Sequence, residues 1–155
     1  MKDKYRLAIV DDHSLVRFGM VETLQDEPDF EVVVQGISAD DAVRIAAEDK
    51  PHLMFLDVNM PGGGVLAAAK INAMAPDVVI AMFSFRQDLA IVRASLAAGA
   101  SGYIVKGIPG AELRELSRKL LAGGQWLDPE LVRRLAVEQT DPELQMRIRV
   151  PDDIC

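Results

Sequence analysis

The sequence has little that would suit an oxidising compartment or a membrane. Its one cysteine, Cys155, is the last residue, so no disulfide can form within the chain. The apolar run at residues 7–10 is far shorter than the roughly 20 residues that cross a bilayer, and the charged start does not resemble a signal peptide. We therefore expect a cytoplasmic protein with no membrane association.

Basic residues are also scarce. Seventeen Lys and Arg stand against 24 Asp and Glu, which gives a net charge of −7. Broad affinity for nucleic acid or anionic lipid is not expected, because such binders neutralise phosphates with clustered basic side chains. The chain nevertheless has 155 residues, half of them hydrophobic, and this is enough for one globular domain with its own core.

Short apolar runs alternate with longer segments of helical character. Runs that are apolar on both faces are typical of strands in a parallel sheet, and they lie at residues 7–10, 32–34, 53–56, 78–83 and 103–105. Apolar spacing and end signals predict helices at residues 14–24, 38–48, 65–73, 88–98 and 111–122. This alternation predicts an α/β fold, a doubly wound five-stranded parallel sheet between two layers of helices.

The pair Gly123 and Gly124 ends this pattern, so we expect one domain over residues 1–124. Residues 125–155 are predicted to be a linker helix followed by a polar tail, and no DNA-binding domain is recognisable there. Trp126 is interpreted as an apolar anchor that packs this linker. The charged residues of the predicted linker helix are expected on a solvated amphipathic face; they are Glu130, Arg133, Arg134 and Glu138.

Polar residues follow the predicted strands, where the ligand site of a doubly wound sheet lies. They are Asp11, Asp12, Asp57, Ser84 and Lys106. Each alone has an ordinary interpretation, such as a helix cap, a turn residue or a solvated lysine. Together they converge on one edge, where three carboxylates would repel each other unless a hard cation neutralised them. Oxygen ligands with open water positions favour Mg²⁺.

Four segments carry a family resemblance: Asp11-Asp12, the run Phe-Leu-Asp-Val-Asn-Met-Pro-Gly at 55–62, Ser84, and the run Gly-Tyr-Ile-Val-Lys at 102–106. They resemble the receiver domain of bacterial two-component response regulators over about residues 5–124. The segments 98–106 and 123–129 are most similar to the NarL/FixJ subfamily. The resemblance implies a flavodoxin-like three-layer sandwich.

The resemblance also implies a role for each site residue. Asp57 would accept a phosphoryl group from the phosphohistidine of a sensor histidine kinase, and Ser84 and Lys106 would bind that group after transfer. The implied Mg²⁺ site consists of Asp11 through water, Asp12 directly, the phosphoacceptor Asp57, and the backbone carbonyl of Asn59. Ser84 and Tyr103 occupy the positions of the family's switch residues.

These roles predict a phosphorylation-dependent signalling switch and not an enzyme, beyond self-catalysed phosphorylation and dephosphorylation. Its output would be a changed surface around the fourth helix, fifth strand and fifth helix, which would form a homodimer or bind a downstream protein. Direct DNA binding by this chain is not expected. The chain is then either a natural single-domain receiver or the amino-terminal part of a longer NarL/FixJ-type DNA-binding transcriptional regulator.

Two other classes remain as alternatives. An aspartyl-phosphate phosphatase of the haloacid-dehalogenase type also uses a strand-end aspartate and Mg²⁺, but it needs a second aspartate where this chain has Asn59. A flavin-binding module of the same fold needs a phosphate-cradling loop after the first strand, where Asp11, Asp12 and His13 stand instead.

Three further residues lie in the segments that form this predicted edge. Phe85 is bulky where the family usually has a small residue, so it either crowds the entrance to Asp57 or packs into the core. Gly107 follows Lys106 where many receivers have proline. His13 is interpreted as a surface residue at the start of a helix.

Overall fold

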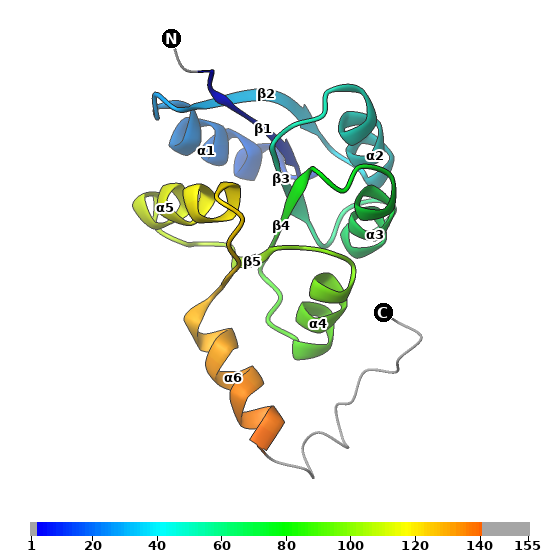
Figure 1. The fold of residues 1–155 in the computed structure, drawn as a ribbon, viewed down its shortest axis with the longest axis vertical. Helices are drawn as coiled ribbons and strands as arrows, with labels where there is room; N and C mark the ends of the chain where they lie inside the picture. The colour runs from blue at the N-terminus through cyan, green and yellow to red at the C-terminus, as the bar shows by residue number, and fades with distance from the viewer. Residues whose placement is uncertain (1–2, 141–155) are drawn as a thin grey trace.

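The computed structural model describes residues 3–140, in which strands and helices alternate along the chain (Figure 1). The strands are β1 (Tyr5–Val10), β2 (Phe30–Gly36), β3 (Leu53–Asp57), β4 (Val79–Ser84), β5 (Gly102–Val105) and β6 (Trp126–Leu127). The helices are α1 (Ser14–Gln25), α2 (Ala39–Glu48), α3 (Gly64–Met74), α4 (Leu89–Ala97), α5 (Gly110–Leu121) and α6 (Pro129–Thr140). The predicted polar tail after residue 140 lies outside the described residues.

All neighbouring strands are parallel, in the order β2-β1-β3-β4-β5-β6. The predicted α/β class, the doubly wound sheet and its five strands are therefore confirmed. The sheet has one strand more than expected, because Trp126 and Leu127 pair with Gly102 and Tyr103 in the segment predicted to be linker. Two residues are too few to show a periodic pattern, so this strand left no signal in the sequence.

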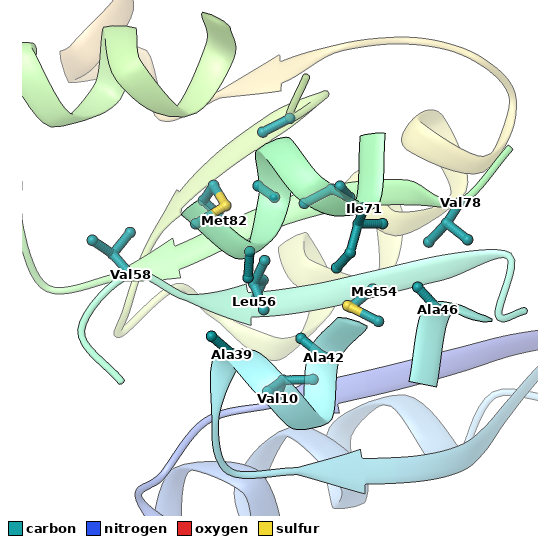
Figure 2. Close-up of a cluster of buried hydrophobic side chains, with 14 of the residues drawn as sticks. Val10, Ala39, Ala42, Ala46, Met54, Leu56, Val58, Ile71, Val78 and Met82 are labelled. Carbon is teal, nitrogen blue, oxygen red and sulfur yellow. The ribbon is translucent and has the colours of Figure 1, made fainter. Parts of the chain in front are cut away.

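Helices cover both faces of the sheet and bury a separate apolar cluster on each. Helices α1 and α5 lie on one face, and α2, α3 and α4 lie on the other (Figure 1). Figure 2 shows the second cluster, in which strand side chains such as Met54 and Leu56 face Ala42 of α2 and Ile71 of α3. Alanine at the helix positions lets these helices lie close to the sheet.

Neither edge of the sheet is a long, regular strand: β2 is interrupted and β6 is short. In β2, Leu7 lies opposite Val32 but Ala8 lies opposite Val34, so Val33 is an extra residue in the ladder. Such a bulge breaks the regular hydrogen-bonding edge. At the other edge, β6 has two residues.

The chain leaves the sheet through β6 and enters α6, which packs against α4. Leu131 of α6 is fully buried and belongs to the same apolar cluster as Val92 of α4, and Leu135 packs against that cluster. Trp126 is half-buried and packs against the opposite cluster, in agreement with its expected role as an anchor. Among the described residues, no helix has the length and apolar character needed to cross a membrane.

Candidate phosphoacceptor site

The strand order brings the predicted site residues to one edge of the sheet. Asp57 is the last residue of the central strand β3, Asp11 directly follows β1, and Ser84 ends β4. Lys106 directly follows β5, and its backbone N–H donates to the carbonyl of Ser84 at 2.9 Å. Because the strands are parallel, all these residues lie at their carboxyl ends, which is where doubly wound sheets bind ligands.

Three charged side chains form the buried centre of this edge. Lys106 Nζ lies 2.7 Å from Asp11 Oδ2 and 3.3 Å from Asp57 Oδ1. The side chain of Lys106 is 4% exposed, and those of Asp11 and Asp57 are 1% and 2% exposed. Two carboxylates thus share one ammonium in a region of low dielectric, where unpaired charge is costly.

This sharing displaces the two carboxyl pKa values in opposite directions. Burial and the charge of Asp11 raise the pKa of Asp57 above its ordinary value, because the opposing effects of Lys106 and of the N–H of Asn59 are smaller. Burial also acts to raise the pKa of Asp11, but hydrogen bonds from Lys106 and from the backbone of His13 outweigh it and hold that pKa below the ordinary value. Lys106 is therefore committed mainly to Asp11, and Asp57 carries the less stabilised charge.

Asp12 and His13 complete an acidic cluster beside this centre. His13 Nδ1 lies 3.0 Å from Asp11 Oδ1 and 3.1 Å from Asp12 Oδ1, although its side chain is 62% exposed. One possible ligand atom each from Asp11, Asp12, His13 and Asp57 lies within 4.8 Å of the others. The surface position expected for His13 is correct, but the sequence interpretation missed its contacts with both carboxylates.

The loop between β3 and α3 shapes the surroundings of Asp57. A Cβ added to Gly64 would lie 2.0 Å from the carbonyl oxygen of Asp57, so this turn requires glycine. The N–H of Asn59 donates to Asp57 Oδ1 at 3.3 Å, while the Asn59 side chain is exposed. Asp57 Oδ2 is buried and accepts no hydrogen bond from the described residues. One oxygen of Asp57 is thus left for a partner from outside.

A hydrogen-bonded path leads from Ser84 into the loop before α4. Ser84 Oγ accepts a hydrogen bond from the N–H of Arg86 at 3.0 Å, and the hydroxyl of Tyr103 donates to the carbonyl of Arg86 at 2.8 Å. Tyr103 is fully buried, and this burial raises the pKa of its hydroxyl. The ring of the residue at the expected switch position thus lies inside the core, with its hydroxyl bonded to the loop before α4.

Phe85 lies outside the core and beside the buried lysine. Its side chain is 69% exposed, so the alternative of a core residue is wrong. Lys106 Nζ lies 5.3 Å from the centre of the Phe85 ring and 5.6 Å from that of Phe83. An ammonium at this distance from an aromatic face is attracted to it. Phe85 is thus placed over the approach to Lys106.

The residues present fit a hard divalent cation. Asp11, Asp12 and Asp57 supply oxygen ligands, and Asp57 Oδ2 is a buried acceptor without a partner. The ammonium of Lys106 balances one of the two buried carboxylates, so the centre retains a net negative charge. Oxygen ligands and excess negative charge are what Mg²⁺ prefers in proteins.

Comparison with known proteins identifies the family to which this chain belongs. Residues 7–118 match the family "Response regulator receiver domain". The chain therefore belongs to the receiver domains of two-component response regulators, which are signalling domains. This family match favours the receiver interpretation over the phosphatase and flavin-binding alternatives.

The chain is similar in sequence to several response regulators. It is 34% identical over 140 residues to the response regulator GacA of Pseudomonas viridiflava and 33% identical over 138 residues to the transcriptional regulatory protein DegU of Brevibacillus brevis. These alignments cover 90% and 88% of this chain but 65% and 58% of the relatives. The chain thus spans about two-thirds or less of their length.

Solved structures agree with this placement. A LuxR-family two-component response regulator from Aurantimonas matches with a TM-score of 0.84 and 31% identity, over 90% of this chain and 100% of that one. The receiver domain of the putative regulator NarL from Mycobacterium tuberculosis matches with a TM-score of 0.76 and 27% identity, over 79% and 99% of the two chains. These relatives are consistent with the NarL/FixJ-like subfamily.

The opposite pKa displacements at the site predict opposite effects on stability. A raised pKa means that protonation of Asp57 favours the folded state, so its contribution is present below the unfolded pKa of about 4 and is lost as pH rises through the folded value. Asp57→Asn should therefore stabilise the protein at pH 7, by about 1 kcal/mol. Denaturant unfolding in chelator-treated buffer at pH 7 and in acid measures this.

Asp11→Asn provides the matched comparison. The lowered pKa of Asp11 means that its contribution to stability is present above the unfolded pKa and is lost as pH falls through the folded value. This variant should destabilise the protein at pH 7, and both differences should shrink in acid. Equal effects of the two variants at pH 7 would contradict the unequal sharing of Lys106.

Proposed function

We propose that this chain is a phosphorylation-dependent switch in which Asp57 accepts a phosphoryl group from a phosphohistidine of a sensor histidine kinase. The observation that carries this proposal is the buried, unpartnered Oδ2 of Asp57 beside Lys106. Oδ2 attacks phosphorus, the P–N bond breaks as the P–O bond forms, and the imidazole leaves with the electron pair and takes up a proton. This is nucleophilic catalysis by a carboxylate.

The surrounding residues would position and neutralise the transferred group. Lys106 lies close enough to Asp57 to pair with the phosphoryl charge, and Ser84 at the end of the neighbouring strand would hydrogen-bond it. Mg²⁺ would be held by Asp12 directly, by Asp11 through water, by Asp57, and by the carbonyl of Asn59. When bound, it would neutralise charge on the phosphoryl oxygens in the transition state.

The output of the switch is proposed to be a protein surface. A phosphoryl group adds up to about two negative charges at a buried edge, so Ser84 and Lys106 would move toward it and shift the loops that carry them. The affected surface includes α4, β5 and α5, and it would serve a homodimer or a downstream protein. We do not expect these 155 residues to bind DNA directly, because the chain is acidic overall.

The phosphoacceptor assignment predicts a single labelling site. In acetyl phosphate with Mg²⁺, intact-mass analysis should show one added phosphoryl group on the wild-type chain and none on Asp57→Asn, because Asp57 Oδ2 has no partner, whereas Asp11 Oδ2 lies 2.7 Å from Lys106 Nζ. Asp77→Asn, which changes an exposed aspartate, is the control and should be labelled like the wild type. Equal labelling of Asp57→Asn and wild type would reject the assignment.

The metal assignment predicts a loss of affinity in Asp12→Ala. Removing a direct oxygen ligand should weaken Mg²⁺ binding about tenfold or more and slow labelling by acetyl phosphate, while the fold stays intact. Titration calorimetry measures the affinity, and circular dichroism checks the fold. Asp77→Ala is the matched control; the same affinity in both variants would remove Asp12 from the site.

The position of Phe85 predicts that it restricts access to Asp57. Phe85→Ala should be labelled faster by acetyl phosphate, whereas Phe85→Leu, which keeps most of the bulk, should stay close to the wild type. Because the ring is exposed, truncation should cost about 1 kcal/mol or less, the size of a surface cation–π contact. An unchanged labelling rate in Phe85→Ala would show that the ring does not screen the site.

A further inference from the structure

Helix α6 is joined to α4 by an apolar contact and by a buried ion pair. Leu131 is fully buried in the cluster that also contains Val92 of α4 and Tyr103 of β5. Glu138, which was expected on a solvated face, is 1% exposed and forms an ion pair with Arg93 of α4. A buried carboxylate is costly without its partner, so this pair specifies how α6 lies on α4.

A second polar contact joins α6 to the loop between β4 and α4. Arg134 donates from Nη1 to the carbonyl oxygen of Gln87 at 2.7 Å. The preceding carbonyl, that of Arg86, accepts the hydroxyl of Tyr103, and the N–H of Arg86 donates to Ser84 Oγ. The loop at residues 86–87 is therefore held by α6 on one side and by two site residues on the other.

One of these contacts, the hydrogen bond from the N–H of Arg86, depends directly on the position of Ser84 Oγ. If Oγ turns toward a phosphoryl group on Asp57, the atom that accepts the N–H of Arg86 moves away from it. The loop then shifts, and the carbonyl of Gln87 shifts with it, because residues 86 and 87 are adjacent. Because that carbonyl accepts from Arg134, the shift would break the Arg134 contact and leave α6 held by Leu131 and the Glu138–Arg93 pair alone.

We propose that α6 is a latch that docks on α4 in the unphosphorylated protein and loosens when Asp57 is phosphorylated. The latch rests on the proposed function, because it uses the recruitment of Ser84. It adds to that function a specific output: α6 is loosened from α4 when its contact with the loop before α4, from Arg134 to the carbonyl of Gln87, is lost. By linkage, any change that loosens α6 also favours the phosphorylated arrangement of the loop.

The test compares amide hydrogen exchange of α6 with and without Mg²⁺ and beryllofluoride, a non-covalent mimic of the phosphoryl group. Exchange at residues 130–138 should rise about fivefold or more in the wild type, which corresponds to a coupling of ordinary size. Arg134→Ala should show raised exchange before the mimic is added. Arg133→Ala is the matched control, because Arg133 is exposed and pairs with Glu130 inside α6.

Calorimetry on the same proteins supplies the reciprocal measurement. Arg134→Ala should bind beryllofluoride more tightly than the wild type, and Arg133→Ala should bind it equally well. Unchanged α6 exchange in a wild-type chain that binds the mimic, and that acetyl phosphate labels at Asp57, would overturn the latch and leave the proposed function standing. Identical exchange in the two arginine variants would likewise overturn it. Failure to label Asp57 would overturn both proposals.

Discussion

The arrangement of charge around Lys106 is the constraint on which the rest of the structure depends. Two buried carboxylates share its one ammonium, which lies 2.7 Å from Asp11 and 3.3 Å from Asp57, in keeping with a lowered pKa for Asp11 and a raised one for Asp57. Asp57 is left with the less stabilised charge and an unpartnered oxygen in a region that excludes much of the water. A site of this kind gains from any ligand that brings positive charge, and it responds strongly when more negative charge is added.

Much of this arrangement was predictable from the sequence, because strand ends are marked by a change from apolar to polar residues. Asp11, Asp57, Ser84 and Lys106 each end or follow an apolar run, and parallel strands bring such positions together. The order of the runs thus predicts both the fold class and the membership of the site. Distances and the unequal sharing of Lys106 were not predictable, since they depend on side-chain positions that no periodicity encodes.

The features that the sequence did not reveal are local or involve a single contact. β6 has two residues, which is below the length at which alternation is visible. Glu138 has the charge of a solvated residue, and its burial follows from Arg93 lying opposite it on α4. For His13, the signal was its position directly after two aspartates. The sequence did not decide whether Phe85 is buried or exposed, because it stands between the buried Ser84 and the exposed Arg86.

The interrupted edges of the sheet have a consequence for how this protein can assemble. A long, regular edge strand would offer its backbone to any other chain and would favour irreversible aggregation. The extra residue Val33 breaks the β2 edge, and the opposite edge offers the two residues of β6. These edges thus offer little backbone to a second chain and favour association through side chains, whose complementarity a single charge can alter. Contacts of that kind form and dissociate more readily than a shared β-sheet edge.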